Sequence, residues 1–344
     1  MRIRLRQLSI VESCKFGLSN KRGHSQEVEV KVGDAARGSY EEVPMFTQML
    51  IPLDGSKTAE KVLPYARFVA GALKLPVELL AVVDIVEMAT HITAARASHL
   101  DTVIEDSVRN SEQYLRGVAG TFPGGTKCTV EKGKAEQVII ETAAADKGMI
   151  ITMATHGRSG INRWLLGSIA EKVLRGTTNP LLLVRATEEA KAETVASWKS
   201  IVVPLDGSEL AESVLPLVAE LAKTLKLAVV LFRAYNIPSS AYAGDEGYYS
   251  INYDEMLTAM RDEAVDYLEK KTEAVKKMGI ANVSSVAKEG FAADEIISLS
   301  RQSPDNLIAM STHGRSGVKR WVLGSVTETI VRHSADPVLV IRAN

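Results

Sequence analysis

The sequence contains one domain-sized pattern twice, and this repeat restricts the possible folds more than any other feature. "MATHGRSGINRWLLGSIAEKV" begins at Met153 and "MSTHGRSGVKRWVLGSVTETI" begins at Met310, with thirteen of twenty-one aligned positions identical. "LIPLDGSKTAEKVLPYA" begins at Leu50 and "VVPLDGSELAESVLPLV" begins at Val202. The two offsets, 157 and 152 residues, differ by a net insertion of five residues in the second copy. A period of this length indicates two tandem domains rather than a solenoid.

The repeat divides the 344-residue chain into four parts, in agreement with the two domains that its length favours. We expect one domain over residues 46–186, a polar linker over 187–198 and a second domain over 199–344. Residues 1–45 lie outside both copies, and we expect them to form a poorly ordered N-terminal extension. Alternatively, "VEVKV" (Val28 to Val32) makes a short edge strand there.

Within each copy, short apolar runs alternate with segments of helical spacing. Val62, Ala66, Val69 and Leu73 show this spacing after the first run. Continuous apolar strands separated by helices are typical of a parallel sheet that is covered on both faces. We therefore predict an α/β fold with two tandem doubly wound, Rossmann-like or flavodoxin-like domains, each with a five-stranded parallel sheet in the order 3-2-1-4-5. The ten expected strands are residues 49–53, 77–83, 127–133, 149–154 and 180–185 in the first copy, and 200–205, 228–235, 283–290, 306–311 and 337–342 in the second.

Composition excludes several classes of partner. A formal net charge of −1 and a pI near 6.6 give no electrostatic basis for binding nucleic acid. The longest apolar runs are far shorter than the ~20 residues of a membrane-spanning helix, so we expect no membrane partner. Cys14 and Cys128 suggest neither a disulfide framework nor a zinc site. These features are most consistent with the cytoplasm.

Two short segments in each copy follow strands and carry polar chemistry. "PLDGS" follows the first strand and includes Asp54 or Asp206, and "THGRSG" follows the fourth. In a doubly wound sheet, ligands bind beyond the carboxyl ends of the strands, where the winding reverses. Glycines allow main-chain N–H groups to approach an anion closely. The helices that open at Gly167-Ser168 and Gly324-Ser325 add free N–H groups, so the segments suit phosphate binding.

The same residues also have purely structural interpretations. Ser168 with Glu171, and the corresponding pair in the second copy, fit the S-x-x-E capping box, in which the two side chains satisfy the helix's own N–H groups. Asp54 and Asp206 fit the N-cap of the first helix. Arg158 and Arg315 suit either phosphate pairing or a solvated loop.

In these motifs and their order, the chain resembles a tandem universal stress protein over about residues 46–344. ATP-binding members of that family carry G-2x-G-9x-G-[S/T] after the fourth strand. Gly157 followed by Gly167-Ser168, and Gly314 followed by Gly324-Ser325, match its second part. The first glycine is replaced by Ala154 in one copy and by Ser311 in the other.

The resemblance implies a nucleotide site in each copy and no catalytic residue. Asp54 and Val82 would hold adenosine in the first copy, and Asp206 and Ala234 would do so in the second. The second-part motif glycines and serines would hold the phosphates, with Mg²⁺ as a companion ion that Asp54 and Asp206 help to bind. The complete predicted set is Pro52, Leu53, Asp54, Val82, Met153, Ala154, Gly157, Arg158, Gly167, Ser168 and Ile169, with Pro204, Leu205, Asp206, Ala234, Met310, Ser311, Gly314, Arg315, Gly324, Ser325 and Val326.

Three functions remain open at this point. The first is a stress-response protein that binds ATP in each repeat without rapid turnover, its repeats packed as an intramolecular pseudo-dimer. The second is a nucleotide-free interaction module of the same family, which Ala154 and Ser311 favour. The third is a slow ATPase. The sequence identifies neither the protein partner nor further pairing into a homodimer.

Overall fold

The structure is a computed structural model that describes residues 16–19, 25–28, 46–86, 88, 100–156, 166–185, 196–237, 253–302, 305–312 and 323–342. The chain divides into two compact units, Met1–Val43 and Pro44–Asn344. In the first unit, β1 (Phe16–Ser19) pairs antiparallel with β2 (Ser25–Val28). The expected strand at Val28 to Val32 overlaps β2 at Val28 alone, and its other residues lie outside the described part.

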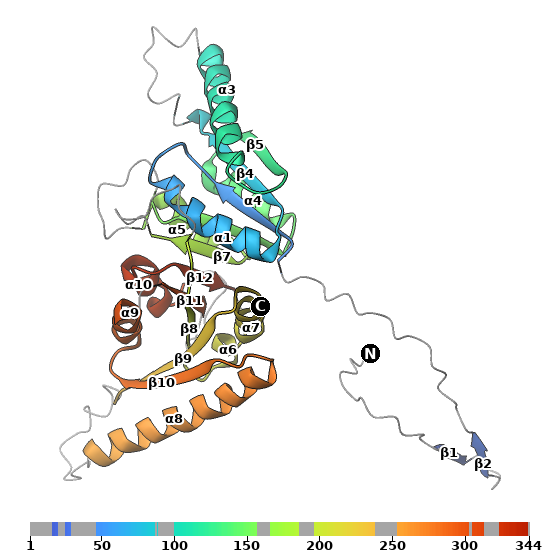
Figure 1. Cartoon of the computed structure of the whole chain (residues 1–344), viewed down its shortest axis with the longest axis vertical. Helices are drawn as coiled ribbons and strands as arrows, with labels where there is room; N and C mark the ends of the chain where they lie inside the picture. Colours follow the sequence, from blue (N-terminus) through green and yellow to red (C-terminus); the bar gives the residue numbers. More distant parts are fainter. Residues whose placement is uncertain are drawn as a thin grey trace. The chain divides into compact units, whose positions relative to one another are not determined.

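The second unit is built on one ten-stranded sheet (Figure 1). Its strand order is β10-β9-β8-β11-β12-β7-β6-β3-β4-β5. Each half therefore has the predicted order 3-2-1-4-5, with all pairs inside a half parallel. The strands are β3 (Gln48–Pro52), β4 (Val77–Val83), β5 (Thr126–Lys132), β6 (Met149–Ala154) and β7 (Leu181–Val184), followed by β8 (Ser200–Pro204), β9 (Ala228–Tyr235), β10 (Val283–Glu289), β11 (Asn306–Ser311) and β12 (Val338–Ile341).

The two halves join through their fifth strands. β12 pairs antiparallel with β7, with Leu339 opposite Leu182. These strands are buried along almost their whole length, so the edge at which each half would otherwise end is covered by the other. The repeats thus form one continuous sheet.

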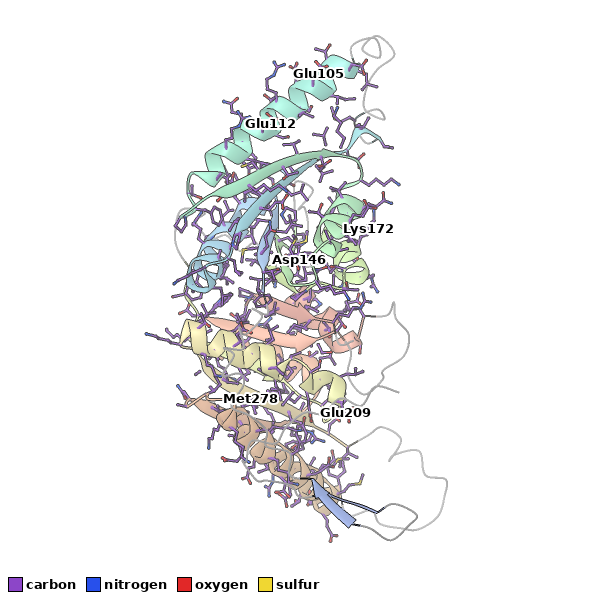
Figure 2. All side chains as sticks on the ribbon, turned by 90° about the vertical axis from the view of Figure 1, so that its right-hand side faces the viewer. Glu105, Glu112, Asp146, Lys172, Glu209 and Met278 are labelled. Atoms are coloured by element: carbon purple, nitrogen blue, oxygen red, sulfur yellow. The ribbon has the colours of Figure 1, made fainter. Side chains whose placement is uncertain are left out.

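Helices cover both faces of this sheet. One layer holds α1 (Leu63–Leu73), α3 (Leu100–Ala119), α7 (Leu215–Leu225) and α8 (Tyr253–Lys277), and the other holds α4 (Ala135–Ala144), α5 (Ser168–Gly176), α9 (Ala292–Gln302) and α10 (Ser325–His333). A short 3-10 helix η1 (Ala59–Val62) precedes α1, and α6 (Glu209–Glu212) precedes α7. Figure 2 shows charged side chains such as Glu105 and Glu112 along the solvated side of α3.

Each layer encloses a hydrophobic core that runs through both repeats. In β4, Leu79 belongs to the α1 layer and Leu80 to the α5 layer, as the alternation of side chains along a strand requires. Trp198, just before β8, is buried against α1, where it stacks on Tyr65 at a centroid distance of 5.9 Å and meets Phe68 edge-on at 5.4 Å. The end of the segment between the repeats is therefore packed into the core through Trp198.

The duplication extends to local backbone geometry. α1 and α7 both begin with Leu-Pro, which suits a first turn because proline's missing N–H needs no partner there. Both end in a left-handed lysine, Lys74 or Lys226, with φ of 54°. Equivalent residues can thus be compared between the halves position by position.

Candidate functional site

The candidate site in each repeat lies at the carboxyl end of the first strand, where the winding of the sheet reverses. β3 has β4 on one side and β6 on the other, and β8 lies in the same way between β9 and β11. Loops that leave neighbouring strands in opposite directions at such a point leave a crevice between them. Both segments selected from the sequence leave strands here.

The loop after the first strand is a tight turn organised by its aspartate. Asp54 Oδ1 accepts hydrogen bonds from the Ser56 N–H at 2.9 Å and from the Ser56 hydroxyl at 2.6 Å. Ser56 Oγ then accepts the N–H of Ala59 at 3.1 Å and caps the helical turn. Gly55 has φ of 78°, a conformation that favours glycine. Asp54 therefore positions the serine that caps, instead of capping the helix itself.

The second repeat reproduces this turn closely. Asp206 Oδ1 accepts from the Ser208 N–H at 3.0 Å and from its hydroxyl at 2.6 Å, and Ser208 Oγ accepts the Ala211 N–H at 3.2 Å. Gly207 has φ of 89°. Ser56 and Ser208 thus fix the turn in both copies. The sequence analysis selected the segment but missed the role of its serine, which the repeated Asp-Gly-Ser triplet could have indicated.

The segment after the fourth strand is closed at its base by a main-chain contact. The Gly167 N–H donates to the Thr155 carbonyl at 2.8 Å, and the Gly324 N–H donates to the Thr312 carbonyl at 3.0 Å. A Cβ added at Gly167 would lie 2.9 Å from the Thr155 oxygen, closer than any real side chain approaches. Glycine is thus required for the close approach that brings the two ends of this segment together.

The helix that follows has a free amino end within the described residues. Gly167 is the N-cap of α5 and Gly324 that of α10, and neither helix has a side-chain cap. The alternative interpretation of these residues as capping boxes is therefore wrong. Ser168 and Ser325 are the first helical residues rather than caps, and both are exposed. The amino ends of α5 and α10 keep the partial positive charge and N–H groups that bind anions.

The glutamates of the rejected capping boxes instead join the two repeats. Glu171 binds Arg175 one turn later at 3.2 Å and lies 3.5 Å from Arg332 of the other repeat. Glu328 mirrors this arrangement, with Arg332 at 2.9 Å and Arg175 at 3.6 Å. Such half-exposed pairs contribute little stability individually, about 0.3–0.5 kcal/mol each. Their geometry matters more, because they tie α5 to α10.

Two further arginines reinforce this connection. Arg342, after β12, donates to the Thr177 carbonyl at 2.8 Å and the Arg175 carbonyl at 3.4 Å, at the carboxyl end of α5. Arg185, after β7, donates to the His333 and Ser334 carbonyls at 3.3 Å, at the carboxyl end of α10. Each helix thus has a cation from the other repeat at the end where its dipole is negative. Sequence reasoning missed these arginines, although "LLLVR" and "VLVIR" repeat them.

The predicted residues that the structure describes occupy equivalent places in the two repeats. Val82 and Met153 belong to the layer of α5, and Ala234 and Met310 to the layer of α10. The side chains of Leu53 and Leu205 pack into the core on the other face of the sheet, the layer of α1 and α7. At the candidate site these two residues can therefore contribute only main-chain atoms. Ile169 is 39% exposed. Pro52, Pro204 and Val326 are half-buried. Gly157, Arg158, Gly314 and Arg315 lie outside the described residues.

The two departures from the family motif cause no backbone strain. Ala154 is the last residue of β6 and pairs with Val184, and Ser311 is the last residue of β11 and pairs with Ile341. The ladder continues one residue further, from the Thr155 N–H to the Val184 carbonyl. Neither residue has a positive φ. A residue with a Cβ is therefore fully compatible with this extended backbone.

His156 adjoins the first repeat's segment with a partly buried imidazole. Its Nδ1 lies 3.0 Å from the Thr155 hydroxyl, and its Nε2 is buried without a hydrogen-bond partner. Burial, and then the charge of Arg185, lower the pKa of this histidine below its usual value. Among the residues that the structure describes, no carboxylate contacts this ring to orient it for proton transfer.

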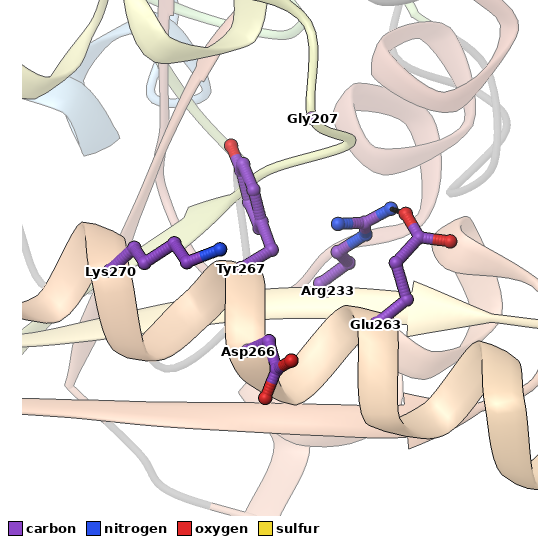
Figure 3. Close-up of a pocket in the computed structure, with 6 residues that line it drawn as sticks. All are labelled: Gly207, Arg233, Glu263, Asp266, Tyr267 and Lys270. Atoms are coloured by element: carbon purple, nitrogen blue, oxygen red, sulfur yellow. Dashed lines mark hydrogen bonds and ion pairs between the residues drawn. The ribbon is translucent and has the colours of Figure 1, made fainter.

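A polar pocket of about 280 Å³ lies beside the second repeat's turn, under α8 (Figure 3). Arg233 Nη2 binds Glu263 at 2.8 Å, and its guanidinium lies 4.6 Å from the centre of the Tyr267 ring. The Tyr267 hydroxyl donates to Glu212 at 2.8 Å. Burial and this hydrogen bond raise the pKa of the tyrosine. The residues that line the pocket are Gly207, Arg233, Glu263, Asp266, Tyr267 and Lys270.

Two basic and two acidic side chains line this pocket, so the lining carries no formal net charge. Pairing of Pro52 with Leu80, and of Pro204 with Phe232, shows that Ala81 takes the place of Arg233 in the first repeat. The first repeat therefore lacks the arginine of this pocket. The contacts of the pocket fasten α8 to β9 and α6, and we interpret it as a structural cluster.

The described residues contain no group of three or more His, Cys, Asp or Glu side chains placed to hold a metal ion. No helix among them is long and apolar enough to cross a membrane.

Comparison with known proteins matches both repeats to one family. The sequence model of the universal stress protein family matches residues 45–185 and again residues 197–342. A universal stress protein of Methanocaldococcus jannaschii is 29% identical over 147 residues, 42% of this chain and 82% of the relative. A putative universal stress protein of Staphylococcus saprophyticus is 32% identical over 151 residues, 42% of this chain and 84% of the relative.

Solved structures show the same fold over both repeats. The crystal structure of a universal stress protein from Archaeoglobus fulgidus has a TM-score of 0.60 at 19% identity, covering 86% of this chain and 98% of that chain. A protein of unknown function from Pseudomonas aeruginosa has a TM-score of 0.56 at 16% identity, covering 86% of this chain and 92% of that chain. At this identity the likeness concerns the fold alone.

Proposed function

The chain belongs to the universal stress protein family as a tandem two-domain member, and we propose that each repeat binds an adenine nucleotide, ATP with Mg²⁺. In this proposal the protein acts in a stress response by binding, in a signalling or protective role, without rapid turnover of the nucleotide. The domains are residues 46–186 and 199–344, joined by the linker 187–198 and preceded by the extension 1–45. The cytoplasm is the proposed location.

One observation carries the proposal: the same anion-binding arrangement occurs twice. In each repeat, an Asp-Gly-Ser turn and the amino end of a helix that has no side-chain cap among the described residues follow the carboxyl ends of two neighbouring strands. Attraction between a phosphate and such a helix end is worth about 0.3–1 kcal/mol, and up to about 2 kcal/mol when partly buried. Additional main-chain N–H bonds would increase the affinity.

The residues around the crevice fit the remaining parts of the ligand. Val82 and Ala234 offer apolar surface to adenosine, and the aspartates can help to hold Mg²⁺ together with phosphate oxygens. Ala154 and Ser311 are strand residues without a positive φ, so the departure from the glycine motif does not strain the backbone. We prefer ATP binding over the nucleotide-free interaction module because the turn and the helix end recur in both repeats.

The interlocked helices support the proposed intramolecular pseudo-dimer. In the proposal, α5 and α10 bind the two anions at their amino ends. Ion pairs join the two helices, between Glu171 and Glu328 in the first turns and Arg175 and Arg332 in the last turns. In the proposal, one chain therefore presents a fixed pair of nucleotides. A protein partner or a second chain would recognise this pair.

Isothermal titration with Mg-ATP tests the proposal if each site is removed without unfolding the repeat. Ser168→Asp places a carboxylate in the first turn of α5, where the helix dipole favours it but where it repels a phosphate. We expect wild type to bind two equivalents, Ser168→Asp and Ser325→Asp one each, and the double variant none. Ser168→Asn, isosteric and uncharged, is the control and should keep both sites.

Two results would contradict the proposal. One is the absence of any heat of ATP binding to wild type at millimolar concentration. The other is unchanged stoichiometry in the double aspartate variant. Phosphate release is followed in parallel, and steady release that persists in the double variant would show that turnover does not use these sites.

A further inference from the structure

The turn that follows the third strand is the same in both repeats. The Gly133 N–H donates to the Val83 carbonyl at 3.1 Å, and the Gly290 N–H donates to the Tyr235 carbonyl at 3.0 Å. Both glycines have positive φ, 149° and 139°. In each copy one residue then separates the glycine from the next helix, α4 or α9. Lys134 and Phe291 are these residues, and they occupy equivalent positions.

Phe291 has no packing role that explains its aromatic ring. It is 72% exposed, more than any other large apolar side chain among the described residues. Lys134 is exposed as well, so the position faces solvent in both repeats. A single exposed apolar residue is ordinary on a protein surface. Its surroundings decide whether it has a function.

Phe291 stands at the edge of the second repeat's crevice, next to the expected adenosine position. β10 lies beside β9 with Lys288 opposite Ala234, and the turn is bonded to the residue that follows Ala234. Ala234 packs in the layer of α9 and α10, and α9 begins directly after Phe291. Phe291 therefore stands where the chain passes from β10 into the helix layer against which Ala234 packs.

The two repeats differ in a complementary way at this end of the crevice. The first has the larger Val82 together with a lysine, and the second has the smaller Ala234 together with an aromatic ring. Replacing valine by alanine removes two methyl groups from the wall of the crevice. The space, bounded by an exposed ring, suits a flat aromatic group that stacks on the phenyl face.

The opposite end of the crevice is the amino end of α10, which suits an anion. Three strand spacings separate β10 from β11, which is about 14 Å across the sheet. A ligand that uses both ends must therefore have an aromatic ring at one end and a charged group at the other. A nucleoside triphosphate has this form.

We propose that Phe291 is a specificity-determining residue that stacks on the base of the nucleotide bound to the second repeat and makes this repeat selective for purine nucleoside triphosphates. This inference rests on the proposed nucleotide binding. The first repeat, with Lys134 and Val82, holds its nucleotide without base stacking at this position and discriminates less between bases.

The test isolates the second site in the Ser168→Asp background and compares ligands with and without a base. Base–aromatic stacking is worth about a fivefold to hundredfold change in affinity. We expect Phe291→Ala to weaken ATP by such a factor, to weaken UTP less, and to leave inorganic tripolyphosphate unchanged. Phe291→Trp should keep or improve ATP affinity. Val265→Ala, an exposed apolar residue on α8 in the other helix layer, is the control and should change nothing.

A reciprocal variant tests sufficiency. In the Ser325→Asp background, Val82→Ala combined with Lys134→Phe should raise the preference of the first repeat for ATP over UTP by about tenfold. Two results overturn the inference alone: ATP affinity unchanged by Phe291→Ala, or ATP and tripolyphosphate weakened equally. Absence of ATP binding in wild type overturns the proposed function and this inference with it.

Discussion

Replacing Asp336 by asparagine is expected to stabilise the protein at neutral pH. The equivalent residue of the first repeat is Asn179, whose side-chain nitrogen donates to the Asp146 carbonyl at 2.7 Å and to the Met149 carbonyl at 3.0 Å. Both turns have the same backbone contact, from the Asn179 N–H to Thr177 Oγ1 and from the Asp336 N–H to Ser334 Oγ. Asparagine at 336 should therefore donate to the carbonyl of Asn306, the counterpart of Met149.

The aspartate cannot make these bonds while it is ionised. Asp336 Oδ2 is buried without a hydrogen-bond partner. Burial raises the pKa of this carboxyl from 3.8 to about 6; the Asn306 and Ser300 side chains oppose the rise, and the charge of Asp305 adds to it. A rise of this size corresponds to a ceiling of about 3 kcal/mol of unfolding free energy. Partial exposure of the side chain reduces the expected effect to about 1–2 kcal/mol.

The pH dependence has a definite sign. An acid whose folded pKa lies above its unfolded value stabilises the fold only while protonated, fully below about pH 4, and this contribution is lost as the pH rises through about 6. Asp336→Asn should therefore gain about 1–2 kcal/mol over wild type at pH 7.5, or about 2–6 °C in Tm. The gain should shrink towards zero at pH 4.

Urea unfolding of both proteins, followed by tryptophan fluorescence and circular dichroism at pH 7.5 and pH 4, measures this difference. Asn179→Asp in the first repeat is the matched control. It should lose stability at pH 7.5 and recover part of it at pH 4. A gain from Asp336→Asn that is equal at both pH values, or a loss at pH 7.5, would refute the reasoning.

Three further changes test the packing and the polar contacts of the fold. Gly167→Ala should destabilise by about 1–3 kcal/mol, because its Cβ would meet the Thr155 carbonyl, whereas Gly71→Ala on the open side of α1 should stabilise by about 0.5–1 kcal/mol; thermal unfolding compares them. Arg342→Ala should cost about 1–2 kcal/mol in chemical unfolding, since it removes bonds to the end of α5. Glu78→Gln should destabilise at pH 7 and much less at pH 3. Burial would raise the pKa of Glu78, but its lysine, threonine and glutamine donors lower it overall, so its contribution is lost as pH falls.

Much of the fold follows from the sequence because buried parallel strands have a clear pattern. The apolar runs at 149–154 and 306–311 match β6 and β11. Because the sequence repeats, the strand order predicted for one half also applied to the other. The joining of the halves through β7 and β12 was not predicted as a continuous sheet. An apolar edge strand has the same sequence pattern whether it meets a helix, a second chain or its own repeat.

The site was predicted less completely. The strand ends and the glycines were identified, because a close main-chain approach leaves few residue choices. The alternative interpretation as a capping box is wrong, since Gly167 and not Ser168 is the N-cap, and Glu171 forms ion pairs with Arg175 and Arg332. One of these arginines comes from the other repeat, and sequence spacing carries no information on such a contact.

Native mass spectrometry of the gently purified chain, before and after addition of Mg-ATP, tests the central claim most directly. The account predicts a chain that takes up two adenine nucleotides, one for each uncapped helix, and that loses one when Ser168 or Ser325 is replaced by aspartate. A chain that stays free of nucleotide at saturating ATP, while remaining folded, would contradict it.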